Sequence, residues 1–275
     1  MTQIKIATWN INSVRLRIEQ VLRFLKEQDV DILCLQEIKC EEHVFPYDPR
    51  RAAGYEHIEV SGQKGYHGTA TVSRIPLHRL PTAFCPREEA RHVSTKVVVG
   101  KTDFELHNFY IPAGGDVADR EENPKFGHKL DFLATMNAYF TKRFSIGDDQ
   151  QILVGDFNIA PHENDVWSHK QLLKVVSHTP LEVGVLKDLQ DSHDFIDIAR
   201  ALLDDDEKLY SWWSYRSRDI NKSDRGRRLD HIWVSQALKE AALGGGRDGF
   251  KVHRDCRFWE RPSDHAPITL NLLLS

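Results

Sequence analysis

The sequence predicts an α/β protein whose β-sheets are covered by helices. Short apolar runs typical of strands occur along the whole chain, and longer stretches with helical spacing stand between them. The order is mixed, neither a strict β-α-β-α alternation nor all-β, and sheets covered by helices account for it. With 40% hydrophobic and 28% charged residues among 275, the chain can bury a core without a disulfide or a structural metal.

The N-terminal half begins with a predicted strand at residues 4–9, where apolar and polar residues alternate. Leu16, Val21 and Leu25 recur near helical spacing and predict a helix over 15–27. The apolar run 30–36 predicts a buried strand. Further strands are expected at 56–60, 68–74, 93–99 and 103–111.

The C-terminal half is expected to open with a helix over 128–144. Its predicted apolar face consists of Leu130, Leu133, Met136, Asn137 and Phe140. A buried strand follows at 151–155, and 165–203 is expected to be mostly helical, with Pro180 in a first helical turn. The remaining strands are expected at 209–214, 229–235, 249–254 and 266–273. Because no low-complexity linker divides the chain, we expect residues 1–275 to form one domain.

Composition excludes several classes of protein. A net charge of 37 − 41 = −4 argues against a protein that coats nucleic acid by bulk charge, although not against an enzyme with a local basic track. No signal-peptide pattern and no apolar run of about 20 residues is present, so no membrane association is expected. The four cysteines lack C-x-x-C spacing, and a cytoplasmic location is expected.

A glycine pattern in the C-terminal region matches the dinucleotide-binding fingerprint only by its letters. Gly244, Gly246 and Gly249 satisfy G-x-G-x-x-G, but a predicted helix precedes them and a strand follows. The fingerprint needs the opposite order. We therefore expect a turn here.

Polar residues gather at the ends of the apolar strands. Any one of them is more often a turn or cap residue than a functional one. Together, carboxylate and amide oxygens without cysteine suit a hard cation, Mg²⁺ or Mn²⁺, and a histidine with a carboxylate partner is a fixed proton donor. The set therefore indicates phosphoester hydrolysis. Its members are Asn10, Asn12, Glu37, Asp156, Asn158, Asp230, Ser263, Asp264 and His265.

These motifs resemble the exonuclease III family of abasic-site endonucleases, a branch of the endonuclease/exonuclease/phosphatase superfamily. Gly155-Asp-Phe-Asn158 and Ser263-Asp-His265 are typical of the whole superfamily. Other segments are specific to the nuclease branch. They are Asn10-Ile-Asn12, Leu35-Gln-Glu-Ile-Lys39, Tyr110-Ile-Pro-Ala-Gly114, Pro124-Lys-Phe126, Ser211-Trp-Trp-Ser-Tyr-Arg216 and Gly226-Arg-Arg-Leu-Asp230.

The resemblance implies a deoxyribonuclease-I-like fold, a four-layer α/β-sandwich of two packed mixed β-sheets flanked by helices. It implies a Mg²⁺-dependent hydrolase that cleaves the phosphodiester 5′ to abasic sites, together with 3′-5′ exonuclease and 3′-end trimming. The expected partner is double-stranded DNA with abasic or 3′-blocked sites. A monomer without an obligatory protein partner is expected, associated with the nucleoid if the source is bacterial.

The resemblance also implies a set of metal-binding residues. Glu37 would be the principal ligand, with Asn10 beside it and Asp264 assisting nearby. Asp156 and Asn158 would share a second metal position. Mn²⁺ is expected to substitute for Mg²⁺. The resemblance does not decide whether the site binds one ion or two.

A second set of implied roles concerns the reaction itself. Asp156 would orient or deprotonate the attacking water, and Asn158 would contact the phosphate or the nucleophile. Asp230 would pair with His265, which contacts the scissile phosphate. Tyr110 would contact the phosphate or the leaving group.

Three positions depart from the family's pattern. Ser13 stands where a glycine is usual, His231 where a larger apolar or aromatic residue is common, and Ile38 where a threonine is usual. None removes a catalytic group. Ser13 is expected to reshape the turn near Asn10, and Ser13 and His231 to affect substrate preference.

Aromatic and basic residues interleave between 210 and 228, a pattern that suits stacking on a displaced nucleotide and binding of phosphates. By resemblance, Trp212 would lie at the pocket for the base-less sugar. Arg216 and Arg227 are expected to contact DNA, and Arg91 with the 64–68 loop is a further candidate. The alternative, without a role in DNA binding, is that one tryptophan belongs to the core and the charged residues form a solvated loop. Strand alternation predicts that one of the two adjacent tryptophans is buried and the other is not.

Two other functions remain open. A phosphatase or phosphodiesterase for a small molecule or lipid would share the superfamily motifs, although the Trp-Trp-Ser-Tyr-Arg and Arg-Arg-Leu-Asp segments argue against it. A non-catalytic DNA-binding protein on a degenerate nuclease fold is disfavoured because every expected catalytic position holds a competent residue.

Overall fold

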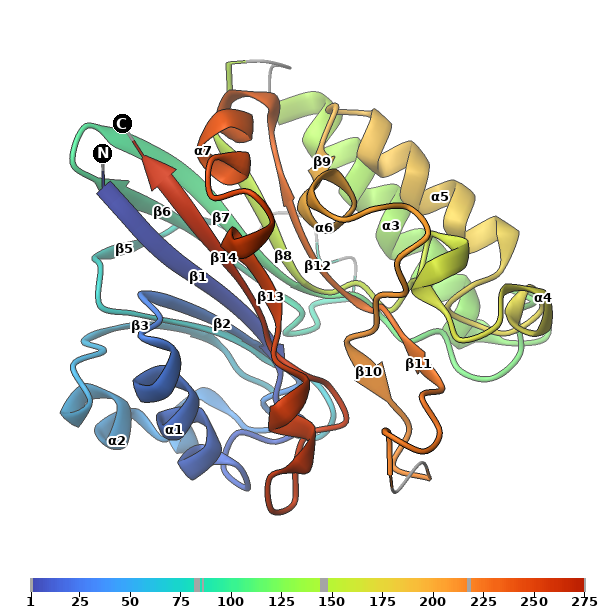
Figure 1. Cartoon of the computed structure of the whole chain (residues 1–275), viewed down its shortest axis with the longest axis horizontal. Helices are drawn as coiled ribbons and strands as arrows, with labels where there is room; N and C mark the ends of the chain where they lie inside the picture. Colours follow the sequence, from blue (N-terminus) through green and yellow to red (C-terminus); the bar gives the residue numbers. More distant parts are fainter. Residues whose placement is uncertain (1, 82–84, 86, 144–147, 217–218, 275) are drawn as a thin grey trace.

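The computed structural model describes residues 2–81, 85, 87–143, 148–216 and 219–274. Within these residues, two six-stranded mixed sheets pack face to face, and helices cover both outer surfaces (Figure 1). The predicted fold class, two packed mixed sheets flanked by helices, is confirmed.

The first sheet contains one parallel pair, β1 with β2, and is otherwise antiparallel. Helix α1 (Ile18–Gln28) connects this pair and lies on the outer face with α2 (Tyr47–Ala52). In spatial order the strands are β13 (Phe250–Val252), β14 (Ile268–Leu274), β1 (Thr2–Asn10), β2 (Ile32–Gln36), β4 (Thr69–Ser73) and β3 (His57–Ser61).

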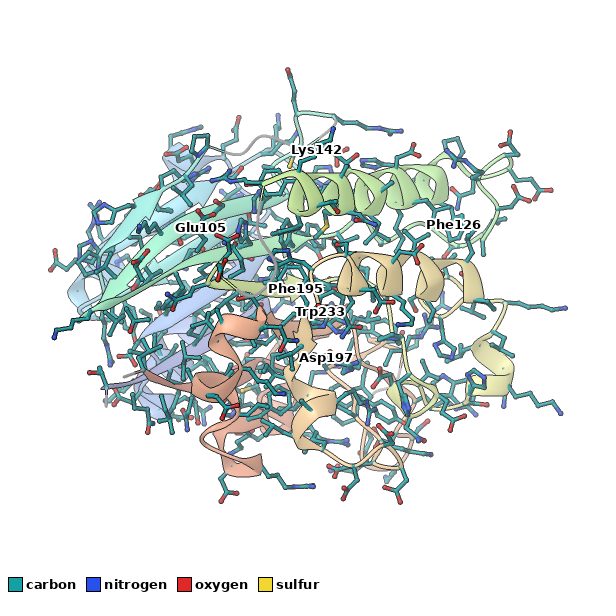
Figure 2. The ribbon with its side chains drawn as sticks, turned by 90° about the horizontal axis from the view of Figure 1, so that it is seen from above. Glu105, Phe126, Lys142, Phe195, Asp197 and Trp233 are labelled. Atoms are coloured by element: carbon teal, nitrogen blue, oxygen red, sulfur yellow. The ribbon has the colours of Figure 1, made fainter. Side chains whose placement is uncertain are left out.

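The second sheet repeats this plan with the parallel pair β7 and β8. Helix α3 (Pro124–Arg143) connects the pair, and α5 (Pro180–Asp191) lies beside it on the outer face (Figure 2). In spatial order the strands are β5 (Leu77–Arg79), β6 (His92–Val99), β7 (Thr102–Tyr110), β8 (Gln151–Asp156), β12 (Asp230–Val234) and β9 (Ile196–Asp197).

Shorter elements complete the described chain. A two-stranded hairpin, β10 (Trp212–Trp213) with β11 (Gly226–Arg227), projects beyond the sheets (Figure 1). The short helices are α4 (His169–Leu172), α6 (Ile198–Leu202) and α7 (Lys239–Leu243). Turns of 3₁₀-helix lie at Glu42–Val44, Glu163–Asp165, Gln236–Leu238, Arg247–Gly249 and Arg254–Phe258.

Apolar side chains fill each of the three interfaces between the four layers. Alternate residues of both sheets, such as Ile6 and Ile152, meet between them. On the outer face of the first sheet Phe24 of α1 packs against Trp9, with ring centroids 5.4 Å apart. Phe195 and Trp233 belong to the cluster between the second sheet and its helices (Figure 2).

Several predicted boundaries are wrong. The first helix begins at Ile18, and Leu16 before it is 57% exposed. The second begins at Pro124 because the Asn123 side chain accepts a hydrogen bond from the Lys125 main-chain N–H (3.1 Å) and caps it. Its predicted end at residue 144 lies outside the described residues.

The interval 165–203 is only partly helical. Helix α5 starts at Pro180 as predicted, but the segment before α4 pairs with the hairpin, Val166 opposite Arg227. Likewise only Trp212 and Trp213 of 209–214 form a strand. The short elements β5, β11 and α2 were not predicted, since each is too short to show a period.

The glycine-rich segment between α7 and β13 is a turn, as predicted. Among the described residues, no helix combines the length and apolar character that a membrane span needs.

Candidate active site

The two sheets bring the ends of six strands to one edge. β1, β2, β7 and β8 end at Asn10, Gln36, Tyr110 and Asp156. β12 and β14 run antiparallel to their neighbours, so it is their beginnings that lie at this edge. Topology therefore gathers residues that are more than 250 positions apart in the sequence: Ser263 donates a hydrogen bond to the Asn10 carbonyl (2.6 Å).

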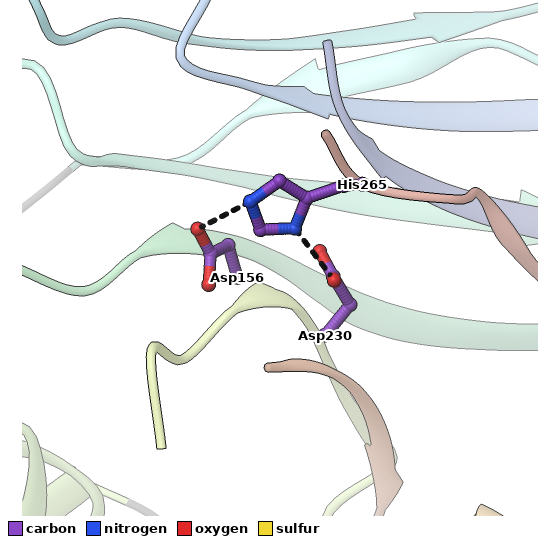
Figure 3. Close-up of side chains that lie close together, drawn as sticks. All are labelled: Asp156, Asp230 and His265. Atoms are coloured by element: carbon purple, nitrogen blue, oxygen red, sulfur yellow. Dashed lines mark hydrogen bonds and ion pairs between the residues drawn. The ribbon is translucent and has the colours of Figure 1, made fainter. Parts of the chain in front are cut away.

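His265 lies between two carboxylates (Figure 3). Its Nδ1 is 2.8 Å from Oδ2 of Asp230, and its Nε2 is 3.8 Å from Oδ2 of Asp156. Asp230 and Asp156 are directly paired across β12 and β8, so their side chains share one face. The Ser211 hydroxyl also donates to Asp230 (2.6 Å) and fixes its carboxylate.

Burial and mutual charge shift the pKa values of this trio. Burial by itself would lower the pKa of His265, but the carboxylates of Asp230 and Asp156 outweigh it and raise that pKa to about 10. Burial raises the pKa of Asp156 to about 7, against the opposing charge of His265. His265 is therefore a protonated imidazole at neutral pH.

Asp156 is held by a turn with left-handed backbone. Asn158, at φ +56°, donates its main-chain N–H to Oδ1 of Asp156 (2.9 Å) and its side-chain amide to Oδ2 (3.1 Å). Gly155 precedes the turn at φ +138°, where a Cβ would lie 2.0 Å from the Phe109 carbonyl oxygen. Only glycine fits there, which explains the Gly-Asp-Phe-Asn motif.

Glu37 forms the second part of the site, after β2 and at φ +53°. Its Oε2 accepts hydrogen bonds from the Asn10 amide (3.1 Å) and the Tyr110 hydroxyl (3.2 Å). The same Asn10 nitrogen donates to Oδ2 of Asp156 (2.9 Å), so one amide joins the two carboxylates. Lys39 pairs with the other Glu37 oxygen (2.8 Å).

These donors fit a hard divalent cation. Glu37 and Asp156 offer carboxylate oxygens on either side of the Asn10 amide. Carboxylate oxygens are the ligand atoms that Mg²⁺ prefers. Ligand atoms of Asp156, Asp230 and His265 also lie within 4.8 Å of one another. A protonated imidazole has no lone pair for a metal, however, so the pair around Asn10 suits an ion better.

Asp264 stands apart from both groups, at the base of the hairpin. One of its oxygens accepts from the Trp212 indole N–H (2.9 Å) and the other from the Asn12 amide (2.9 Å). Each oxygen accepts one of these hydrogen bonds and keeps a second lone pair.

The hairpin carries the predicted DNA-contact residues beside the site. Trp213 is fully buried and Trp212 is half-buried, as strand alternation predicts. The Arg227 guanidinium lies 5.3 Å from the Trp212 ring and is fixed by the Ser177 hydroxyl (2.7 Å). Arg216 is exposed. Arg218, a basic residue of the same segment, lies outside the described residues.

Arg91 lies on the other side of the site, over the Tyr110 ring at 5.0 Å. Its side chain pairs with Glu89, so its charge is partly satisfied within the protein. Arg91, Tyr66 and Lys125 line a hollow of about 430 Å³ next to Tyr110.

The three departures from the family's pattern leave the site intact. Ser13 adopts φ +85°, in the left-handed region that favours glycine. His231 points away from Asp230 into the core, where it stacks on Phe157 with ring centroids 4.9 Å apart. Ile38 is buried as well.

Sequence reasoning missed the supporting residues Lys39, Ser211 and Lys129. Lys39 and Ser211 lie in the motifs quoted above, but nothing in a motif says which member touches a carboxylate. Lys129 had a readable signal, because it falls on the apolar face of α3 with Phe126 and Leu133.

Comparison with known proteins agrees with this geometry. Residues 7–265 match the endonuclease/exonuclease/phosphatase family. Exodeoxyribonuclease III of Haemophilus influenzae is 31% identical over 96% of this chain and 98% of its own length. Two solved structures are similar: an AP endonuclease from Archaeoglobus fulgidus (TM-score 0.88, 28% identity, 99% of this chain and 100% of that one) and a 3′-5′ exonuclease from Neisseria meningitidis (0.87, 30%, 98% and 100%). The chain therefore belongs to the endonuclease/exonuclease/phosphatase family, in its exonuclease III branch.

Proposed function

We propose that this protein is a metal-dependent DNA repair hydrolase that cleaves the phosphodiester 5′ to abasic sites and also trims 3′ ends as a 3′-5′ exonuclease. One observation carries the proposal. The protonated His265 and the carboxylates of Asp156 and Glu37, which the Asn10 amide joins, meet at one sheet edge, beside a hairpin that presents Trp212 and Arg227. The names of the relatives, an exodeoxyribonuclease III and an AP endonuclease, support the same activity.

The chain's own residues supply most of the mechanism. Asp156 orients the attacking water and takes its proton, and Asn158 keeps that carboxylate in place. His265, held by Asp230, donates to a phosphate oxygen as negative charge develops. Tyr110 donates to the phosphate or to the leaving oxygen once the phosphate replaces Glu37 as its partner.

Glu37 and Asn10 are the residues we assign to the principal metal, with Asp156 and Asn158 available for a second position and Asp264 nearby. A bound Mg²⁺, or Mn²⁺ in its place, would neutralise charge on the phosphate and on the leaving oxygen.

The proposed partner is double-stranded DNA with abasic or 3′-blocked sites. Trp212 would face the base-less sugar, and Arg91, Arg216 and Arg227 would contact phosphates on either side. We further propose that residues 1–275 act as one domain, as a cytoplasmic monomer that needs no protein partner. Packing of both sheets around one core supports the single domain.

The first test uses two labelled duplexes, one with a single stable abasic analogue and one undamaged with a recessed 3′ end. We expect one cut 5′ to the analogue in Mg²⁺, abolished by EDTA, and shortening of the recessed end. An intact abasic duplex in both Mg²⁺ and Mn²⁺, with turnover of an inositol phosphate instead, would contradict the proposal. Such a result would favour a small-molecule phosphatase on the same fold.

A further inference from the structure

Helix α3 carries a fully buried lysine next to the site. Lys129 is 0% exposed and lies on the apolar face of the helix. Its ammonium pairs with the carboxylate of Glu182, which is also 0% exposed. It further donates to the main-chain carbonyls of Asn158 (2.8 Å) and Ala113 (3.3 Å). A buried charge is tolerated only where such partners surround it.

Glu182 is bound just as completely from its other side. Its carboxylate accepts hydrogen bonds from the Ser177 main-chain N–H (3.0 Å) and from the Thr179 hydroxyl (2.6 Å) at the start of α5. These donors fix the carboxylate, and the carboxylate fixes the Lys129 ammonium. The pair is therefore a rigid junction between α3, α5 and the two loops that Lys129 contacts.

Both of those loops carry proposed catalytic residues. Ala113 follows Tyr110 by three positions, and the next residue, Gly114, packs on the lysine: a Cβ added there would lie 2.9 Å from Cδ of Lys129. Asn158 itself has φ +56°, a conformation that non-glycine residues rarely adopt. The carbonyl that accepts from Lys129 belongs to this left-handed residue.

We infer that Lys129 is a positioning residue for Asn158, which it acts on through the main-chain carbonyl. By holding that carbonyl, Lys129 keeps Asn158 in the left-handed conformation, and this conformation directs its main-chain and side-chain N–H groups at Asp156. Glu182 supplies the counter-charge that lets an ammonium stand at this buried place. The inference deepens the proposed function and rests on it for the role of Asn158.

A double-mutant cycle tests whether Lys129 acts through Asn158. Single-turnover cleavage of the abasic duplex is compared among the wild type, Lys129→Met, Asn158→Ala and the double variant. We expect Lys129→Met to slow cleavage about tenfold in the wild-type background and by a smaller factor in the Asn158→Ala background, which lacks the side-chain N–H that reaches Asp156 but keeps the main-chain one. An equal loss in both backgrounds, or no loss in the first, would overturn the inference.

Hydrogen exchange of the Asn158 main-chain amide gives a readout that needs no turnover. This amide donates to Asp156, and we expect it to exchange about tenfold faster in Lys129→Met while the Leu270 amide in β14 keeps its protection. Unchanged exchange at Asn158 in Lys129→Met would overturn the inference, whether or not the wild type cleaves DNA. Failure of the wild type to cleave DNA would instead contradict the proposed function.

Two further variants guard against general loss of stability. Leu272→Ala opens a cavity in the core far from the site and should neither slow cleavage nor speed local exchange at Asn158. Where Lys129→Met alone does not fold, Lys129→Met/Glu182→Gln takes its place, since it leaves no unpaired buried charge. The expected results are the same for this double variant as for Lys129→Met.

Discussion

Asp156 is the residue on which the site depends most. It accepts N–H groups from Asn10 and Asn158, faces His265, and stands directly across from Asp230. Burial raises its pKa to about 7, so it is a far better proton acceptor than an exposed aspartate. A carboxylate so constrained can hold one water in a fixed direction.

We expect Asp156→Asn and His265→Ala each to lower kcat by at least about a hundredfold, with DNA binding largely kept. The amide cannot take a proton, and the alanine leaves the developing phosphate charge without its donor. Steady-state cleavage of the abasic duplex, alongside a binding titration in EDTA, separates the two quantities. Near-normal turnover in either variant would remove that residue from the mechanism.

The pH profile of kcat/KM should report His265. Because its pKa is raised to about 10, the imidazolium persists through neutral pH, and on the alkaline side activity should fall only as pH rises through about 10. Asp230→Asn removes the carboxylate that contributes most to this rise, so the alkaline fall should move to lower pH. An unmoved alkaline limb in Asp230→Asn would show that another group controls it.

At the scale of elements, the β10–β11 hairpin joins the core to the proposed DNA surface. Two residue pairs define it, Trp212 with Arg227 and Trp213 with Gly226. Trp213 anchors the hairpin in the core, and a Cβ at Gly226 would collide with the Tyr210 side chain, 2.5 Å from its Cβ and 2.6 Å from its ring. Alternation then leaves Trp212 on the opposite face, where it reaches Asp264.

We expect Trp212→Ala to raise KM for the abasic duplex by about tenfold, through loss of the aromatic face. Trp212→Phe is the matched control, because it keeps an aromatic ring while it removes the N–H that binds Asp264. If the ring matters, the phenylalanine variant should bind nearly as well as the wild type. Unchanged KM and kcat in Trp212→Ala would rule out a role in substrate binding.

At the scale of the whole molecule, buried histidines link stability to pH. Burial lowers the pKa of His231 to about 4 and that of His253 to about 4, from an ordinary 6.5. Between these values the unfolded chain binds more protons than the folded one. The free energy of unfolding should therefore fall as pH falls from about 6.5 to about 4, by about 3 kcal/mol for each histidine.

His231→Phe should reduce this loss, because the variant lacks one of the histidines that take up a proton on unfolding. The measurement is urea unfolding at pH 7.5 and pH 5, where the difference in unfolding free energy between the two conditions should be smaller than in the wild type. His43→Ala is the control, since His43 is exposed and should leave the difference unchanged. An undiminished loss in His231→Phe would place the acid sensitivity elsewhere.

Long periodic elements were predictable and short ones were not. The apolar run at β8 and the spaced apolar face of α3 each reveal their type within one segment. The hairpin, β5 and the loop before α4 have no period of their own, and distant partners fix them, as Arg227 fixes Val166. The same holds in the site: motifs marked Asp156 and His265, but no local pattern marked Ser211 as the partner of Asp230.

Hydrophobic patterning and the motifs along the chain were enough to predict the fold class, the family and the residue types of the site. Which oxygen faces which donor became visible only in three dimensions. One Asn10 nitrogen joins Glu37 to Asp156, Asp264 binds Trp212 and Asn12, and Lys129 binds the Asn158 carbonyl. These contacts form between strand ends brought together by the packing of two sheets, and their energies depend on distance and burial rather than on separation along the chain.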